Sequence, residues 1–470
     1  MRVLFATAEL APVASVGGLA QAAAGLVAEL RVPAAGGPGI DVDVVMPDYG
    51  GIELADETTR PLAVPAWAGP AVLRRGRHEV AGPLSLVQAP GLVRPHPYLQ
   101  ANGEGWPDNT ARFLAFSRAV AAIANAERPD VLHLNDWHTG AALAALDGSI
   151  PSVLSLHNLA YQGVSGGDWL TRLGPRARHY EWYGTTNPLS GAIALADAVV
   201  AVSPNYAVEI LTPAGGFGLD GPLRHRWDAV SGILNGIDTT VWDPATDDNL
   251  ASNFTAAGAA PARVAAKAAN RAEVRRRAGF DDDDDVLLAV MVSRLTGQKG
   301  ADLLLPIVPL LDQVPLRVVV LGSGEQAIAD SLGHAAALYA DRFRFVHGYD
   351  NELAHLLFGA GDLYLMPSRF EPCGLTQMQA MRYGALPVVT DVGGLHDTVR
   401  DADRHPDGNG FVAPHADSAA LTAALFRAVR RVANPRQRAT IASRGMKQDW
   451  SWAGPAQEYL DLYAGLLAGT

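Results

Sequence analysis

Cysteine is almost absent from this chain, since Cys373 is the only one among 470 residues. A single thiol excludes an internal disulfide and is typical of a protein that works in a reducing compartment. Lysine is nearly as scarce: Lys267, Lys299 and Lys447 are the only three, although arginine is abundant. Where lysine is kept in such a chain, we expect a chemical reason for it.

Positive charge and long apolar runs are also lacking. The net charge of −12 argues against a nucleic-acid partner or an anionic membrane surface, because both are bound by clustered Lys and Arg. No apolar run reaches membrane-spanning length, and the amino terminus meets a charge too early for a signal peptide. The sequence therefore predicts a soluble, cytoplasmic protein, and neutral polyol ligands remain compatible with its charge.

The length predicts two domains, because 470 residues exceed one ordinary core. An apolar strand at 3–6, a glycine turn ending at Gly17 and Gly18, and an Ala-rich helix at 19–30 form the first unit of a doubly wound sheet. Strands alternating with helices continue along the chain, which favours parallel α/β sheets covered on both faces. We expect domains at 1–243 and 244–451, and a final helix within 452–470 that packs back on the first domain.

Polar side chains follow several of the expected strands. In open α/β sheets ligands bind outside the carboxyl ends of the strands, so Gly17, Asp136, His138 and His157 are expected to converge on one crevice. A lone histidine at a strand end is more often structural. The convergence of four positions is therefore the local argument for a site.

The turn at 367–377, PSRFEPCGLTQ, joins a buried strand to a helix. Cys373, Gly374, Leu375 and Thr376 are expected to open that helix, whose first N–H groups have no intrahelical partner and can hold an anion. Glu371 beside them is better suited to sugar hydroxyls than to phosphate. The alternative is an acidic loop residue stabilised by the helix dipole.

This turn resembles the signature of bacterial glycogen and plant starch synthases, which are retaining glycosyltransferases of GT-B architecture: two facing Rossmann-like domains with a cleft between them. Four further segments resemble that family's motifs in the same order: NDWHT at 135–139, HNLAYQG at 157–163, LNGID at 234–238 and VSRLTGQKG at 292–300. Five long motifs in register are far more specific than a short glycine pattern. The resemblance covers nearly the whole chain. It implies a nucleotide diphosphate-activated donor as substrate, no cofactor and no metal.

The resemblance also implies roles for single residues. Arg294 and Lys299 would neutralise the leaving diphosphate, because such electrostatic stabilisation is usually the largest catalytic term; the alternative is two exposed basic residues in a turn. Glu371 would bind the donor sugar's hydroxyls, with 373–376 around it. His157 would lie near the anomeric carbon and Asp136 on the acceptor side.

The remaining donor-binding positions implied by the family are Ser15, Gly17, Gly18, Asn235, Gly322 and Tyr349. Tyr349 would stack on the nucleotide base, although a core tyrosine is the alternative. Asp136 and Glu371 could also suggest the carboxylate pair of a glycosidase. Arg294 and Lys299 would then have no role.

The chain departs from the family at the first glycine turn. Synthases of this family carry Lys-X-Gly-Gly-Leu there, followed by Ala-Asp, whereas this chain has Ser15 in place of the lysine and Gln21 in place of the aspartate. Losing a charge near a reacting centre can cost orders of magnitude in rate. We therefore expect the donor, the acceptor or both to differ from those of the housekeeping enzyme.

Three interpretations follow. The first is a specialised relative of the pseudo-glycosyltransferase type, which couples a nucleotide-activated sugar or cyclitol to a sugar or amino-sugar acceptor. The second is a glycogen synthase that elongates α-1,4-glucan from ADP-glucose, and the third is a non-catalytic glucan-binding relative. The two missing charges favour the first over the second. The oligomeric state is left open, a homo-oligomer included.

Overall fold

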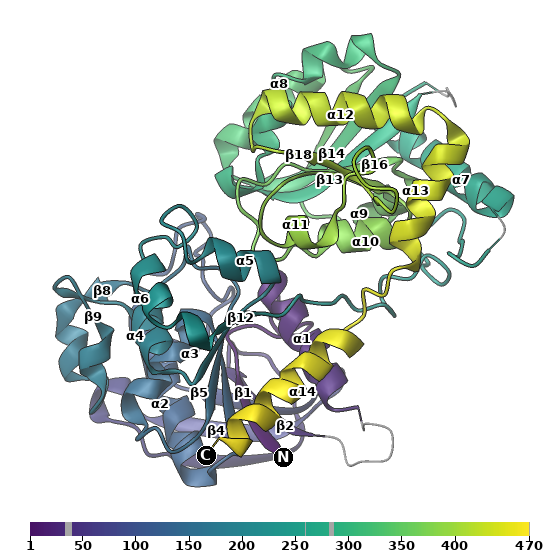
Figure 1. Cartoon of the computed structure of the whole chain (residues 1–470). Coiled ribbons are helices and arrows are strands. Elements are labelled where there is room, and N and C mark those ends of the chain that lie inside the picture. Colours follow the sequence, from purple (N-terminus) through teal and green to yellow (C-terminus); the bar gives the residue numbers. More distant parts are fainter. Residues whose placement is uncertain (33–39, 259, 282–285, 470) are drawn as a thin grey trace. The chain divides into compact units, whose positions relative to one another are not determined.

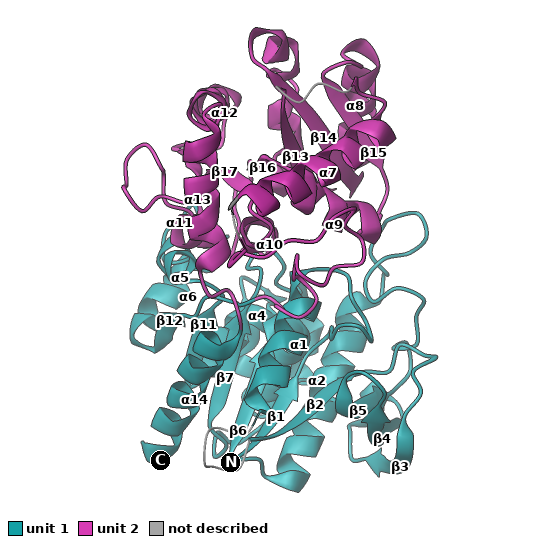
Figure 2. Cartoon of the chain, turned by 90° about the vertical axis from the view of Figure 1, so that its right-hand side faces the viewer, with its two compact units in different colours: residues 1–236, 452–470 teal, residues 237–451 magenta. Residues whose placement is uncertain are grey.

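The computed structural model describes residues 1–32, 40–258, 260–281 and 286–469. The chain forms two compact units, which Figure 2 colours separately. Unit 1 consists of Met1–Gly236 together with Trp452–Thr470, and unit 2 consists of Ile237–Ser451. Among the described helices, none combines the length and the apolar character needed to cross a membrane.

Unit 1 is built on a nine-stranded sheet in the order β12-β11-β7-β6-β1-β2-β5-β4-β3. Its strands are β1 (Arg2–Ala6), β2 (Asp41–Pro47), β3 (Ala55–Leu62), β4 (Ala71–His78), β5 (Gly82–Gln88), β6 (Val131–Asn135), β7 (Ser152–Leu156), β11 (Ala198–Ala201) and β12 (Val230–Gly232). Neighbours run parallel from β12 to β5, and β4 pairs antiparallel with both β5 and β3. The parallel core is the expected doubly wound pattern, extended at one edge by a meander.

The helices of unit 1 are α1 (Gly18–Leu30), α2 (Asn109–Glu127), α3 (Asp136–Gly140), α4 (Pro188–Leu195), α5 (Pro204–Glu209), α6 (Asp220–His225) and α14 (Ala453–Ala468). A small antiparallel sheet in the order β8-β10-β9 adds β8 (Ser165–Gly166), β9 (Glu181–Trp182) and β10 (Thr185–Thr186). Five short 3-10 helices complete the described part of the unit: η1 (Ala66–Ala68), η2 (Ala141–Ala145), η3 (Gly167–Thr171), η4 (Ala177–Tyr180) and η5 (Trp227–Ala229).

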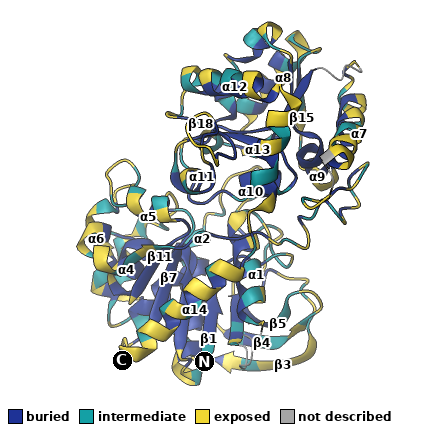
Figure 3. Ribbon diagram, turned by 45° about the vertical axis from the view of Figure 1, so that its right-hand side comes forward, coloured by how far each residue is buried: buried dark blue, intermediate teal, exposed yellow. Residues whose placement is uncertain are grey.

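The central strands of unit 1 are buried along nearly their whole length, as the dark blue strands in Figure 3 show. In β1, Val3 and Phe5 face one side of the sheet and Leu4 the other, and all three are at most 2% exposed. A strand covered on both faces must be apolar without alternation. This is why the apolar runs in the sequence were sufficient to find these strands.

The C-terminal helix α14 packs on unit 1 beside α1 (Figure 1). Gly25 of α1 makes the contact possible, because a Cβ there would lie 2.0 Å from Nε1 of Trp452. On the sheet, the buried His133 ring lies between Tyr463 Oη at 2.6 Å and Ser155 Oγ at 2.8 Å. Polar pairing therefore anchors α14 in addition to its apolar contacts.

Unit 2 is built on a six-stranded, all-parallel sheet in the order β15-β14-β13-β16-β17-β18. Its strands are β13 (Leu287–Leu295), β14 (Leu316–Gly324), β15 (Phe343–His347), β16 (Leu363–Met366), β17 (Leu386–Thr390) and β18 (Phe411–Ala413). Its helices are α7 (Ala260–Ala278), α8 (Gln326–Leu338), α9 (Asn351–Ala360), α10 (Thr376–Arg382), α11 (Gly393–Thr398), α12 (Ser418–Val432) and α13 (Pro435–Lys447). Its described 3-10 helices are η6 (Gly297–Lys299), η7 (Ala301–Leu304) and η8 (Val308–Gln313).

The boundary between the units lies at Gly236, earlier than the expected boundary at 243. The segment from Ile237 onward is bonded to unit 2. The N–H of Ile237 donates to the carbonyl of Trp450 at 2.8 Å, and Trp242 stacks on His355 with ring centroids 4.0 Å apart. The motif at 234–238 therefore contains the point where the chain passes from unit 1 to unit 2, which its sequence does not indicate.

Candidate active site

Two loops of unit 2 are joined to each other through their backbones. The N–H of Arg369 donates to the carbonyl of Gln298 at 2.8 Å, and Gln298 Nε2 donates to the carbonyl of Phe370 at 3.2 Å. Gly300 has φ +66°, and a Cβ there would lie 2.0 Å from the carbonyl oxygen of Pro367. Only glycine allows this approach. The loop after β13 and the loop after β16 therefore form one framework.

That framework brings Lys299 and Glu371 together. Lys299 Nζ lies 2.6 Å from Glu371 Oε2, which also accepts a hydrogen bond from Ser368 Oγ at 2.9 Å. The side chains are only 17% and 6% exposed. An ammonium has three donors, and this pair uses one of them, so Lys299 keeps donors for a ligand while Glu371 keeps a second oxygen. The alternative of two exposed basic residues in a turn therefore does not hold for Lys299.

Glycines shape the turn that follows Glu371. The N–H of Gly394 donates to the carbonyl of Glu371 at 3.1 Å. Gly393 has φ +43°, and a Cβ there would lie 1.9 Å from the same carbonyl oxygen. A Cβ at Gly394 would lie 2.0 Å from the carbonyl of Cys373. The start of α11 is therefore pressed against this turn, and no larger residue fits at either glycine.

Helix α10 begins later than the sequence suggested. Its first residue is Thr376, and Leu375 is its N-cap. The expected opening at Cys373 is incorrect because Gly374 has φ +72°, a left-handed conformation that a helix cannot contain. Cys373 is buried at 5% exposure and lies in the turn itself.

Three further predicted residues lie at the ends of strands β13, β14 and β15. Arg294 is exposed and makes no ion pair within the described part of the chain. Gly322 lies against β13, where a Cβ would be 2.2 Å from the carbonyl oxygen of Ser293. Tyr349 is 88% exposed, so the interpretation of it as a core tyrosine is wrong. An exposed cation and an exposed aromatic ring near one sheet edge are available to a ligand.

In unit 1 the glycine turn is held by Glu9, which the sequence analysis did not select. Glu9 Oε2 accepts from the N–H groups of Val16 at 2.7 Å and Gly17 at 3.0 Å, and its Oε1 accepts from Tyr98 Oη at 2.7 Å. The residue is only 4% exposed. A carboxylate that accepts several hydrogen bonds fixes the loop that donates them.

Around that turn the backbone is open. Ser15, Gly18 and Gln21 are exposed, and a Cβ at Gly17 would meet nothing within 4 Å. Gly17 is also in an extended conformation, with φ −151°. Neither crowding nor a strained backbone therefore requires glycine at position 17.

Asp136 begins α3 directly after β6. It is buried at 6% exposure with φ +54°, and its Oδ1 accepts from the N–H of His157 at 2.8 Å. Burial raises the pKa of Asp136 to about 7, although the backbone hydrogen bonds from His157 and Asn158 oppose that shift. Its carboxyl is therefore poised to change charge near neutral pH.

His157 follows β7 and is uncharged. Its Nε2 lies 2.8 Å from Oδ1 of Asn135, whose own Nδ2 donates to the carbonyl of Ala6 at 2.9 Å. Asn135 thus presents its oxygen, so His157 Nε2 carries the proton and Nδ1 is left as an acceptor. Burial lowers the pKa of the ring to about 4.

The other predicted positions of unit 1 are more deeply packed. His138 is 8% exposed, and its ring lies against Trp137, with centroids 4.3 Å apart, and against Phe113 at 4.7 Å. It is therefore part of an aromatic cluster, and its buried Nδ1 has no hydrogen-bond partner within the described part of the chain. Asn235, 6% exposed, donates its backbone N–H to the carbonyl of Val202 at 3.3 Å.

Comparison with known proteins extends these observations over the whole chain. Residues 2–225 match the model of the starch synthase catalytic domain, and residues 270–445 match that of glycosyl transferases group 1. A glycogen synthase of Halorhodospira halophila is 42% identical, over 100% of this chain and 99% of the relative. One of Rhodospirillum rubrum is 39% identical over the same shares. The chain belongs to the glycogen and starch synthase family.

Solved structures agree with that membership. The catalytic domain of starch synthase IV from Arabidopsis thaliana, bound to ADP and acarbose, matches with a TM-score of 0.86 and 30% identity over 99% of both chains. Sucrose-phosphate synthase of Thermosynechococcus elongatus matches with a TM-score of 0.62 at 18% identity, which speaks for the fold alone. The expected family, the GT-B fold class and glycosyltransferase activity are confirmed, and the non-catalytic interpretation is set aside.

Two interpretations remain, the glycogen synthase and the specialised transferase, and the comparisons favour the first of these. The relatives that match over full length are named glycogen synthases, which favours glycogen synthesis over the specialised transferase that we had ranked first. The family likeness also explains what sequence reasoning missed. Asn135 and Ser368 lie inside the quoted segments at 135–139 and 367–377, but Glu9 had no periodicity or spacing that pointed to it.

Proposed function

We propose that this synthase transfers glucose from ADP-glucose to the end of an α-1,4-glucan chain. The observation that carries the proposal is the buried pair of Lys299 and Glu371. Lys299 Nζ and Glu371 Oε2 lie 2.6 Å apart, on two loops whose close approach requires glycine. Two facts support the choice of substrates. Full-length relatives are named glycogen synthases, and a 30% identical structure is bound to ADP and acarbose.

In this proposal unit 2 provides charge to the leaving group. Lys299 directs its unused donors at the departing diphosphate, and exposed Arg294 can take a phosphate oxygen bidentately. Glu371 accepts from the sugar hydroxyls with the oxygen that Lys299 leaves unoccupied. Because the nucleotide diphosphate is part of the substrate, the proposal needs no cofactor. Tyr349, which is 88% exposed, offers a face for the base.

Unit 1 provides hydrogen bonds in the proposal. The neutral His157 offers its Nδ1 as an acceptor, and the open backbone of Gly17 and Gly18 can approach a ligand closely. Asp136 is assigned to the acceptor side. Either its carboxylate or the departing phosphate can take the proton of the acceptor hydroxyl, and the pH dependence of the rate separates the two.

The direct test is turnover. The protein is incubated with ADP-glucose and glycogen, and both ADP release and chain growth are measured. We expect ADP release to match glucose incorporation and to require both substrates. The matched control is Lys299→Met, which keeps the length of the side chain and removes its charge. Full ADP-glucose consumption without chain growth, or no turnover by the folded protein, would overturn the proposal.

A second candidate function is favoured by one observation, the loss of both ionic groups at Ser15 and Gln21. In this alternative the donor or the acceptor is a specialised sugar or cyclitol. Ser15 is exposed, so Ser15→Lys introduces the family's lysine without crowding. A large gain in glucan elongation by this variant supports an impaired synthase. No gain, together with poor wild-type elongation, supports the specialised enzyme.

A further inference from the structure

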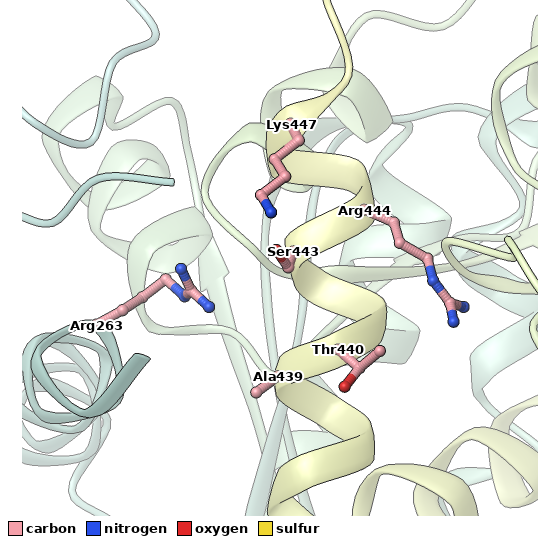
Figure 4. A pocket seen from close by; sticks show the side chains of 6 residues that line it. All are labelled: Arg263, Ala439, Thr440, Ser443, Arg444 and Lys447. Carbon is pink, nitrogen blue, oxygen red and sulfur yellow. The ribbon is translucent and has the colours of Figure 1, made fainter. Parts of the chain in front are cut away.

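A hollow of about 420 Å³ lies on unit 2 between α7 and α13, within the size range of small-molecule sites. It is lined by Arg263, Ala439, Thr440, Ser443, Arg444 and Lys447. Figure 4 shows Arg263 and Lys447 reaching into the gap from its two sides, with Ser443 and Ala439 on the wall formed by α13. Three of the six lining residues are cations, and none is an acid.

These cations are held in place without a carboxylate of their own. Arg263 is only 8% exposed and donates to the carbonyl of Ala256 at 3.2 Å, and Arg444 donates to the carbonyl of Gly408 at 2.7 Å. Lys447 is exposed. In the described part of the chain none of the three forms an ion pair. Their charge is therefore uncompensated in a protein whose net charge is −12.

The excess of positive charge continues beneath the hollow. Arg263, Lys267 and Arg271 are spaced four residues apart and therefore share one face of α7. Asp362, directly before β16, pairs with Arg271 of that face at 2.6 Å and also with Arg438 at 3.3 Å. Lys267 donates only to carbonyl groups of the backbone.

The titration of Lys267 agrees with this excess. Burial lowers its pKa to about 7; Asp362 opposes that shift, and Arg271, Arg438 and Arg263 contribute to it. An anion bound in the hollow would relieve that repulsion. The two helix ends near the hollow have opposite effects on an anion. Arg263 lies in the first turn of α7, and the N-terminal end of a helix attracts anions. The C-terminal end of α13 repels them, and the positive charge of Lys447 offsets that repulsion.

We propose that this hollow binds a small phosphorylated molecule, namely a phosphate monoester on a compact carbon skeleton such as a hexose phosphate. A monoester carries a charge close to −2 at pH 7 and has three acceptor oxygens, which suits an Arg, a Lys and a serine hydroxyl. Ala439 offers an apolar surface for the carbon skeleton. A long anionic polymer is disfavoured, because the acidic protein around the hollow would repel its remaining charges.

The hollow is built on a helix that also supports the candidate active site. Gly445 of α13 packs against α10, since a Cβ at Gly445 would lie 3.0 Å from Met381. Helix α10 continues from the turn that carries Glu371. The proposed ligand would therefore bind a helix in direct contact with the element behind that turn, through residues that have no part in the transfer.

The test is calorimetric titration of the full chain with inorganic phosphate and with a hexose phosphate, while saturating ADP occupies the donor site. We expect hexose phosphate to bind in the presence of ADP, and Lys447→Glu to weaken that binding about tenfold, or 1.4 kcal/mol. Arg436→Glu is the matched control, because Arg436 is an exposed cation on the same helix and does not line the hollow. We expect it to change the affinity less than about twofold.

Arg263→Gln provides a second variant from the opposite wall. It should cause a similar loss of affinity, with thermal unfolding as the check that the buried position still folds. Binding that ADP abolishes, or equal losses in Lys447→Glu and Arg436→Glu, would overturn the proposal. Because the readout is binding with the donor site filled, its failure is distinct from a failure of the transfer reaction.

Discussion

The candidate reacting groups of unit 2 and unit 1 differ in how they are charged and paired. In unit 2, Lys299 and Glu371 form a salt bridge, with Nζ and Oε2 2.6 Å apart. In unit 1, His157 is neutral, and the pKa of Asp136 is raised to about 7. Unit 2 thus contributes a salt bridge, whereas unit 1 contributes groups that are neutral or whose charge depends on pH.

The difference clarifies what the altered glycine turn has lost. Glu9 holds the backbone of that turn through the N–H groups of Val16 and Gly17, and this framework does not involve the side chain of Ser15. Replacing the family's lysine therefore removes a charge and leaves the shape of the turn in place. In the proposed reaction the cations of unit 2 neutralise the diphosphate, so the chain would keep the larger electrostatic contribution to transfer.

The largest effect is expected from breaking the charged pair of unit 2. Lys299→Met should lower the turnover of ADP-glucose about a thousandfold, because it removes donors from the leaving diphosphate and leaves Glu371 buried without a counter-ion. Initial rates with glycogen measure this. The control is the double variant that combines Lys299→Met with Glu371→Gln. If its loss of turnover equals the product of the two single-variant losses, the two side chains do not act together as a pair.

The carboxyl of Asp136 in unit 1 should make the transfer rate depend on pH. Below pH 7 the carboxyl of Asp136 is protonated, so if it accepts a hydrogen bond as an anion, the transfer rate should rise as the pH passes about 7. Asp136→Asn keeps the oxygen that faces the N–H of His157 and should lower the rate about a hundredfold while abolishing that rise. An unchanged pH profile in Asp136→Asn would assign the proton to the departing phosphate.

The raised pKa of Asp136 should also make the free energy of unfolding depend on pH. A native pKa above the ordinary 3.8 favours the folded state below pH 4, and that contribution is lost as the pH rises to about 7. Chemical unfolding of the wild type between pH 4 and 8 should therefore lose stability that Asp136→Asn retains. Parallel curves for the two proteins would contradict the burial of this carboxyl.

Two glycines provide a matched pair of variants, one from each unit. Gly393→Ala should destabilise the protein by about 3 kcal/mol, because the added carbon would lie 1.9 Å from the carbonyl of Glu371 at a φ of +43°. Gly17→Ala should leave thermal unfolding unchanged, since its Cβ would meet nothing within 4 Å. It should instead raise the KM for ADP-glucose about tenfold, because a ligand would meet the methyl group. Equal melting temperatures for the two variants would contradict the packing described.

The smallest effect is expected at Glu9. Glu9→Gln replaces one carboxylate oxygen by an NH₂ group, which cannot accept from either the turn or Tyr98. The loss should be about 1 kcal/mol in unfolding free energy, as for one hydrogen bond. Glu104→Gln, at an exposed position, is the control and should change nothing measurable. A neutral Glu9→Gln would mean that the turn does not depend on this carboxylate.

Much of the fold could be predicted because parallel strands are buried on both faces. The expected helix at 19–30 and the structural α1 at Gly18–Leu30 differ by one residue. Strand β3 was not predicted, because only its Leu62 is buried and the strand is defined by its pairing with β4. A strand whose residues mostly face water leaves no periodic apolar signal.

The site could be predicted as a set of residues but not as an arrangement. Motif likeness selected Lys299 and Glu371, yet they are 72 residues apart, and no spacing indicates that they pair. The pairing depends on close backbone approaches at Gly300 and Gly393, which are tertiary features. Glu9 was invisible for the same reason, since its partners become neighbours only when the turn closes.

The cations of unit 2 are proposed to hold the donor diphosphate. Calorimetric titration with ADP of the wild type, Arg294→Ala and Asp136→Asn tests this without any acceptor or turnover. We expect Arg294→Ala to weaken ADP binding at least about tenfold and Asp136→Asn to change it less than about twofold. Undiminished ADP affinity in Arg294→Ala, with a large loss in Asp136→Asn, would contradict the assignment of fixed charge to unit 2.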